Sequence, residues 1–337
     1  MASPPAFMGY VGYVRIESGV TFGIRCDSCD LKLTQTINPE EVVASRFDRT
    51  VYRLGPKEVG GSIGFPAVMD PNGGGIGSVD VVPQLWLAAI ERDPDGRMLH
   101  VLNTIKVKYT SDNATFDFHN CLVDQFKFTV AQSEMVKMNI DIIGKSRECL
   151  GTSGGYLTDT ELGGERNARA LTWNDVYLKI TLPGGDSFTG EWVRNFELTL
   201  QNNIERFYTL NGCLSPQDIA AKIRAIDGSM TIMGRNPLLG EYAAKLNEGD
   251  CYADGSIHCG YFVSKCQANW GINLPGVIYE IEQMSLKNDL MESTVAWHSY
   301  PGSPRVVAIA GGGQTVTMET FVEDVPGVVN TTCDTAS

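Results

Sequence analysis

Two short stretches of this sequence carry the same pattern: residues 194–212 read RNFELTLQNNIERFYTLNG, and residues 28–40 read SCDLKLTQTINPE. In each stretch two leucines alternate with a polar residue, a polar run follows, and then an isoleucine. The leucines are Leu31 and Leu33 in one stretch and Leu198 and Leu200 in the other. Such alternation predicts a half-buried β-strand. Because the same pattern occurs twice, 167 residues apart, the chain is predicted to repeat one structural unit.

The similarity continues beyond these strands. At the same offset, residues 59–63 (VGGSI) align with residues 226–230 (IDGSM). A Gly-rich segment at 70–78 occurs only in the first copy, and after it the offset falls to about 155, where Trp297 lies near the position of Ile142. The shared order of segments, with one insertion, indicates an internal duplication.

The apolar pattern predicts a mainly β, α+β fold in which each copy forms a sheet or sandwich with one helix on its side. In the first copy we expect strands at 11–17, 21–25, 29–36, 59–67, 104–109, 115–119, 124–130 and 135–143. In the second copy we expect strands at 171–182, 196–202, 226–234, 261–269, 277–286 and 290–298. Helices are predicted at 83–92 and 237–247, since each of these begins with Pro, which suits a first helical turn.

This pattern divides the chain into a first domain at 1–149, a second domain at 150–300 and a C-terminal extension at 301–337. Gly, Thr and charged residues at 150–169 predict a linker. In the extension, apolar runs at 305–310 and 315–322 either add a strand to a neighbouring chain or cover an edge of their own domain. The sequences NPEE at 38–41 and SPQD at 215–218 resemble capped first turns of helices.

The composition argues against several classes of protein. The formal net charge of −13 is opposite to the basic surface of a nucleic-acid-binding protein. Two explanations of the acidity stay open: an acidic protein lets DNA pass without binding it, or the acidity serves solubility alone. No apolar run of about 18 residues predicts a membrane span. The N-terminal sequence lacks the features of a signal peptide, so we expect the protein to be made and kept in the cytoplasm or released by lysis.

The sequence contains no recognisable catalytic or ligand-binding motif. Nine cysteines cannot all pair within one chain, and the CxxC at Cys26–Cys29 has no second CxxC to complete a zinc site. The four histidines form no ligand pair, and the glycines at 73–77 lack the strand-to-helix setting of a nucleotide site. We therefore predict no catalytic, cofactor-binding or metal-binding residue, no cofactor, and no enzyme.

The stretch DVYLKITLPGGDSFTGEWVRNFELTLQNNIERFYTLNG, with the later IDGSMTIMG, resembles the tail tube proteins of tailed bacteriophages. The first copy shows the same order more loosely, as CDLKLTQTINPE and then VGGSIGFPAV, and the resemblance covers most of residues 11–300. It implies tandem tube-type β-sandwich or barrel domains, each with one flanking helix.

The resemblance also implies a structural virion protein of the viral tail. Such domains form rings of six that stack into a hollow tube for DNA ejection into the host, and a two-domain chain would make a pseudo-hexameric ring from three copies. The implied partners are further copies of the chain, other tail proteins and passing double-stranded DNA that is not specifically bound, with no membrane. We further expect a pore wall of net negative charge, and we expect any disulfides that form to link neighbouring chains. By analogy with long loops in the family, the Gly73 loop is expected to serve stacking between rings.

The sequence leaves two other hypotheses about the function open. One is a different virion protein, such as a tail completion, baseplate or decoration protein. The other is a two-domain β binding module, for example one that binds carbohydrate. Binding modules usually expose clustered aromatic residues, whereas the five tryptophans here are dispersed among predicted elements.

Overall fold

The computed structural model describes a mainly β protein, which confirms the predicted fold class. The described residues are 12–18, 20–40, 51–69, 81–92, 97–98, 100–108, 115–151, 169–181, 187–210, 212–233, 255–263, 267–281, 292–299 and 305–307. In this part of the chain every strand pair is antiparallel.

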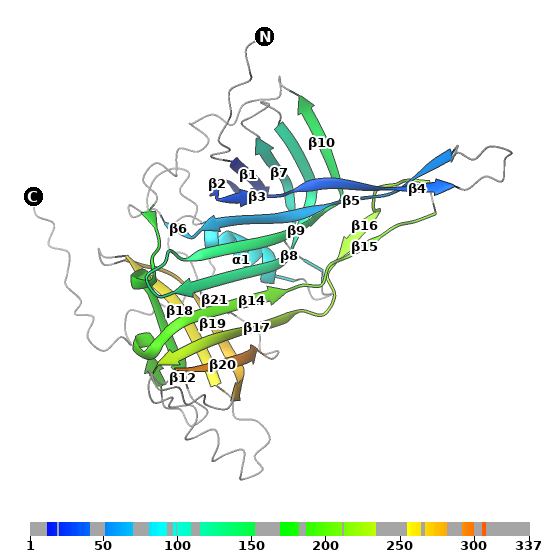
Figure 1. The fold of residues 1–337 in the computed structure, drawn as a ribbon. Helices are drawn as coiled ribbons and strands as arrows, with labels where there is room; N and C mark the ends of the chain where they lie inside the picture. The colour runs from blue at the N-terminus through cyan, green and yellow to red at the C-terminus, as the bar shows by residue number, and fades with distance from the viewer. Residues whose placement is uncertain are drawn as a thin grey trace, which may run out of the picture.

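The first half of the chain forms two sheets that share one long strand (Figure 1). Its strands are β1 (Gly12–Ser18), β2 (Val20–Cys26), β3 (Ser28–Cys29), β4 (Lys32–Glu40), β5 (Val51–Pro66), β7 (Leu102–Lys108), β8 (Thr115–Ala131), β9 (Lys137–Gly144) and β10 (Ser146–Gly151). A peripheral sheet has the order β2–β1–β7–β8–β10, and the main sheet begins β4–β5–β9–β8, with β3 also paired to β5.

One helix, α1 (Val81–Ile90), packs behind β8 and β9 in the view of Figure 1. Every side chain from Leu85 to Ile90 is buried, and the Trp86 ring meets Phe126 of β8 edge-on at 5.1 Å between centroids. A helix that is apolar on all sides belongs inside a core. The helix predicted at 83–92 is thus confirmed, with Pro83 in its first turn.

The second half of the chain has the same pairing order. The strands of its two sheets are β12 (Val176–Thr181), β13 (Ser187–Thr189), β14 (Val193–Gln201), β17 (Ala225–Met233), β18 (Gly255–Val263), β19 (Gln267–Ile281), β20 (Glu292–Ser299) and β21 (Arg305–Val307). β13–β12–β18–β19–β21 corresponds to the peripheral order β2–β1–β7–β8–β10, and β14–β17–β20–β19 corresponds to β4–β5–β9–β8. The domain boundaries at 149 and 300 stay a prediction.

Glycine is required in the shared Gly-Ser motif of both halves. Gly61 pairs with Ile142, and Gly228 pairs with Trp297, the same two positions that the sequence comparison aligned. Gly61 has a φ of 150°, and a Cβ there would approach the Asp30 carbonyl oxygen to 2.5 Å. A Cβ on Gly228 would collide with the Trp297 ring. One motif thus satisfies two different steric demands.

Several predicted elements differ in the structure. Residues 115–119 and 124–130 are not two strands but parts of β8, which passes from one sheet to the other. Asn120 in the middle of β8 has a φ of 50°, and a bulge follows between Val123 and Gln125. Bulges bend a strand without ending it, so the polar interruption in the sequence resembled a turn.

Two further predictions were wrong. The strand expected at 261–269 straddles β18 and β19, which pair with each other. Neither of the proposed helix starts begins a helix, because Asn38 lies in β4 and Pro216 precedes the short strand β16 (Asp218–Ala220). A capping motif acts only where a helix follows it, and here the chain pairs as strands instead.

The structure of residues 305–307 bears on whether the 305–310 run pairs with a neighbouring chain or with its own domain. β21 (Arg305–Val307) pairs with β19 of its own chain, so this part of the 305–310 run covers an edge of its own half. The predicted helix at 237–247, most of the linker, the Gly-rich 70–78 segment and the 315–322 run lie outside the described residues.

Candidate assembly interface

The two halves are joined edge to edge by β8 and β14. Seven residue pairs connect these strands, from Asn195 opposite Ala131 to Gln201 opposite Gln125. The side chains that face the core are all buried; they are Phe126, Phe128 and Val130 on β8, and Phe196, Leu198 and Leu200 on β14. The main sheet therefore continues without a break from β4 to β19, and both halves share one apolar core.

Directly after β14, Asn202 forms a buried polar contact between the halves. Its Nδ2 donates to the backbone oxygens of Ala89, 2.8 Å away, and Val123, 2.9 Å away. Its Oδ1 accepts a hydrogen bond from Arg92 at 2.9 Å. Since Asn202 is fully buried, these hydrogen bonds replace all of its bonds to water. They hold the start of the segment that follows β14 in place against the first half.

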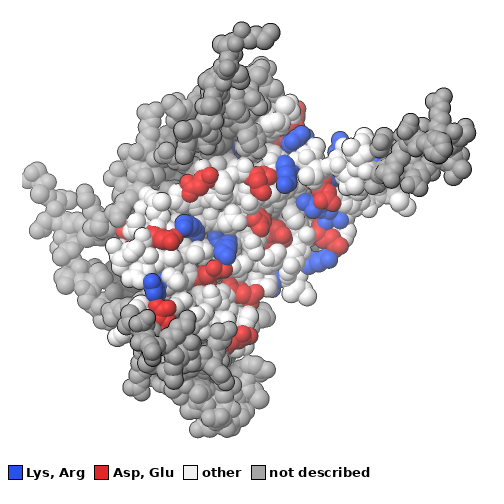
Figure 2. Space-filling model, viewed as in Figure 1, with Lys and Arg blue, Asp and Glu red and all other residues white. Residues whose placement is uncertain are grey.

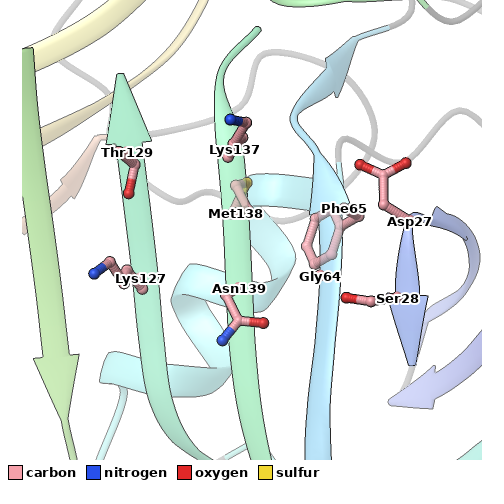
Figure 3. Close-up of a pocket in the computed structure, with 9 residues that line it drawn as sticks. All are labelled: Asp27, Ser28, Gly64, Phe65, Lys127, Thr129, Lys137, Met138 and Asn139. Carbon is pink, nitrogen blue, oxygen red and sulfur yellow. The ribbon is translucent and has the colours of Figure 1, made fainter. Parts of the chain in front are cut away.

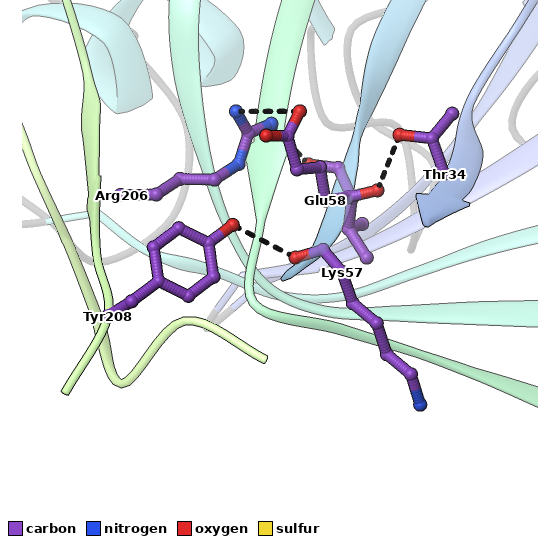
Figure 4. Close-up of polar contacts among 6 residues, drawn as sticks. Thr34, Lys57, Glu58, Arg206 and Tyr208 are labelled. Carbon is purple, nitrogen blue, oxygen red and sulfur yellow. Dashed lines mark hydrogen bonds and ion pairs between the residues drawn. The ribbon is translucent and has the colours of Figure 1, made fainter. Parts of the chain in front are cut away.

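The chain that connects β14 to β17 rests on the first half. It contains the hairpin of β15 (Glu205–Phe207) and β16 (Asp218–Ala220). Figure 4 shows the Tyr208 hydroxyl donating to the Lys57 carbonyl oxygen at 3.0 Å and Arg206 lying beside Glu58. Arg206 also donates to the Val59 carbonyl oxygen at 2.9 Å. We call residues 202–224 the docked connection.

The face of the main sheet opposite α1, here called the open face, carries charged side chains of both signs (Figure 2). Its acidic residues in the paired segments include Glu58, Asp141, Glu197, Asp227, Glu280 and Glu292, and its basic residues include Lys32, Lys127, Lys137 and Arg194. Lys127 Nζ lies 2.7 Å from Glu197 Oε1, across the β8–β14 junction. Acidic groups thus outnumber basic groups on this face.

A shallow depression of about 280 Å³ lies on the open face between β3, β5, β9 and β8 (Figure 3). Its polar lining includes Lys127, Lys137 and Asn139. The two ammonium groups already have carboxylate partners, because Glu197 contacts Lys127 and Glu134 contacts Lys137 at 2.6 Å. This arrangement leaves no excess positive charge to hold an anion.

His298 lies between two carboxylates on the open face. Its Nδ1 is 2.7 Å from Asp227 Oδ1, and its Nε2 is 3.0 Å from Glu280 Oε1. Hydrogen bonding to Asp227, and secondarily to Glu280, raises the pKa of His298 above its ordinary value. On the same face, burial raises the pKa of Asp141, and the charges of Asp124 and Asp30 add to this effect.

The described residues contain no group of three or more His, Cys, Asp or Glu side chains placed to hold a metal ion. Cys26 is buried and Cys29 is half-buried, while Cys149 and Cys213 are exposed. No helix in this part of the chain is long and apolar enough to cross a membrane. The predictions that no residue is catalytic or binds a cofactor, and that disulfides link neighbouring chains, stay predictions.

The repeated motif led to the correct strands but not to the contacts between them. β14 and β4 are the two strands that the opening stretches predicted, and among the described residues only β14 of the two is paired on both sides. The role of Asn202 was missed, although its motif was noted, because burial of one asparagine among polar neighbours leaves no signal in a sequence. His298 and its two carboxylate partners lie on three different strands, so spacing along the chain did not predict this contact.

In the described part of the chain the main sheet runs from one half into the other and ends at β4 and β19, and edges of such sheets are where proteins commonly add further strands. The family model described as phage tail tube protein matches residues 4–233, more than half of the 337 residues, and the chain belongs to this family. No match was found among curated proteins.

Membership of this family defines the general role of the chain. It is a structural protein of a bacteriophage tail, located in the tail of the virion. Tail tube proteins assemble with copies of themselves and with other tail proteins, and the family is generally non-enzymatic.

Proposed function

We propose that the chain is the major tail tube subunit, and that three chains, each with two tube domains, form a pseudo-hexameric ring. The domains are residues 1–149 and 150–300, followed by the extension at 301–337. Rings stack into a hollow conduit for ejection of viral DNA, after assembly in the host cytoplasm. The observation that carries this proposal is the β8–β14 junction, where one half already pairs with a second half of the same topology.

Repeating this junction between chains closes a ring. By the matched topology, the counterpart of β14 is β4, and the counterpart of β8 is β19. Among the described residues β4 pairs only with β5, and residues 278–281 of β19 pair only with β20, so each strand has an unpaired edge. Pairing β4 of one chain with β19 of the next is a heterologous contact, which forms a ring when the rotation closes.

Stacking of rings is supported by apolar side chains at both ends of the main sheet. Met135, Trp173 and Trp192 are exposed at one end, and Phe207, Tyr208, Leu210 and Ile223 are exposed at the other. Large exposed apolar side chains gathered in this way are typical of contact surfaces. Contact between unlike ends of successive rings would bury both sets.

The open face is the candidate pore wall, because α1 covers the opposite face. Its excess of carboxylates repels DNA phosphates, and salt screens this repulsion beyond about 10 Å at 0.1 M ionic strength. A basic wall would instead bind phosphates by counterion release in every ring and slow the passing duplex.

Cryo-electron microscopy of assembled material tests the ring and the pore together. We expect three copies of the chain per ring, with Asp141, Glu197 and Asp227 facing the channel. Native mass spectrometry of dissociated rings checks the copy number independently. Six complete chains per ring, or a channel lined mainly by Lys and Arg, would contradict the proposal.

A further inference from the structure

Within the docked connection, Ile204 packs on the first half of the chain. It adjoins an apolar cluster in which Met98, Leu122 and Ile219 are buried and Ile143 is partly buried. This cluster is separate from the main core. It lies next to the β8–β14 junction, since Leu122 belongs to β8 and the Ile204 amide donates to Asp124 Oδ1 at 2.7 Å.

The matched position in the first half is Ile37, 167 residues earlier, and its surroundings are different. Ile37 is 58% exposed, and Leu54, its partner across β4 and β5, is 57% exposed. The outer parts of β4 and β5 project together beyond the rest of the main sheet (Figure 1). We call residues 35–40 with 51–57 the projecting arm. Ile37 and Leu54 are neighbours on this arm, and both are largely exposed to water in the single chain.

We propose that the projecting arm docks on the second half of another copy of this chain, as the docked connection docks on the first half of its own. This inference rests on the proposed ring. The occupant is a second copy because the arm continues from β4, whose unpaired edge is the one that meets β19 of the neighbour in that ring. The arm is the outer end of β4 with the start of β5, and it occupies the place in the first half at which the docked connection follows β14 in the second.

The strand register identifies the receiving surface. Ile143 pairs with Gly60 and His298 pairs with Asp227, so His298 occupies the position of Ile143. Leu122 then corresponds to Ile278, because Leu122 pairs with Ile143 and Ile278 pairs with His298. Ile37 of one copy therefore packs on Ile278 of β19 in its neighbour, beside His298.

Site-specific photocrosslinking tests this contact in assembled tubes. A photoreactive phenylalanine analogue replaces Ile37, and tubes are formed from a mixture of ¹⁴N-labelled and ¹⁵N-labelled chains. We expect crosslinked peptides of mixed isotope that join position 37 to β19 near Ile278. The same analogue at Leu210, an exposed position in the docked connection, serves as control and should not label this part of β19. Links confined to one isotope, or to the first half of the neighbour, would overturn the inference.

A charge variant provides a second test. The Ile37→Asp/Leu54→Asp double variant should keep the melting temperature of the unassembled chain, because both side chains are exposed there. It should raise the concentration needed for ring formation at least tenfold. Asn103→Asp, which places a negative charge at an exposed position of β7 outside the arm, should assemble close to normally.

The outcomes separate this inference from the proposed ring. If the wild-type chain forms no three-chain ring, the proposed function fails. If wild-type rings form and the double variant forms them equally well, only the docking of the arm is wrong. Variant rings that form but do not stack would assign the arm to contacts between rings and would also overturn the inference.

Discussion

β14 and β4 have the same sequence pattern and matched places in their halves, but different surroundings. β14 lies between β17 and β8, and its leucines are fully buried. Within the described ranges β4 is paired with β5 alone, and Leu33 is only partly buried. The same difference separates Ile204, which packs in a cluster, from the exposed Ile37. A repeated strand is completed within the chain in one place and leaves an edge in the other.

This difference indicates what the second copy of the motif contributes. The second half finds its partner within the chain, since the first half is always present. In the proposed ring the first half pairs with a further copy of the chain, which is the partner that the topology offers. Edge strands left unpaired promote association, so a matched edge at each end of the sheet favours assembly over a monomer.

The largest expected effect comes from the buried leucines. Leu200→Ala should lower the free energy of unfolding of the unassembled chain by about 2–5 kcal/mol, because it leaves a cavity at the junction of the halves. Leu33→Ala, at the matched position, should cost about 1 kcal/mol, since less apolar area is lost there. Urea unfolding measures both free energies, provided that the dependence of the unfolding free energy on urea concentration is the same in the variants and the wild type. Equal losses would show that the two strands do not differ in packing as described.

The next effect concerns the polar contact between the halves. Asn202→Ala removes the donor for the buried Ala89 and Val123 carbonyl oxygens and should cost about 1–3 kcal/mol in unfolding free energy. The control is Asn203→Gly, because Asn203 is exposed and has a φ of 52°, which Gly adopts without strain. We expect this control to change stability by less than about 1 kcal/mol. A loss in the control as large as that in Asn202→Ala would argue against a special role for Asn202.

The smallest effect depends on pH. Because the pKa of His298 is raised in the folded chain, its carboxylate contacts stabilise the fold fully below the unfolded value near pH 6.5. This stabilisation is lost as the pH rises through the folded pKa. His298→Gln should therefore destabilise the chain more at pH 5.5 than at pH 8.5, by under about 1 kcal/mol, since the groups are half exposed.

Ile143 occupies the matched position in the first half and provides the control for this pH effect. Ile143→Val should change stability equally at both pH values, because no titratable group is altered. NMR titration of the imidazole signals measures the pKa of His298 directly. A pKa at or below that of a free histidine would contradict the contacts with Asp227 and Glu280.

The sequence by itself predicted most strands of the main sheet and the buried helix α1, while the duplication and the second helix at 237–247 stay predictions. Alternation at Leu198 and Leu200, and at Leu31 and Leu33, indicates which face of a strand is buried, and this is a local property of the chain. The Gly-Ser motif marked Gly61 and Gly228, because only glycine satisfies the steric contacts found at both positions. The same local signals failed at Asn120, where a polar interruption within β8 resembled a turn.

Only the tertiary structure decided which edges meet. Backbone N–H and C=O groups form the β8–β14 junction, and they are the same in every residue except proline, so no residue pattern identifies their partner. The burial of Asn202 and the exposure of Ile37 both follow from that pairing, since each depends on whether another half lies beside the strand. Matched sequences acquired different environments because a chain with two copies of the motif can complete only one of them internally.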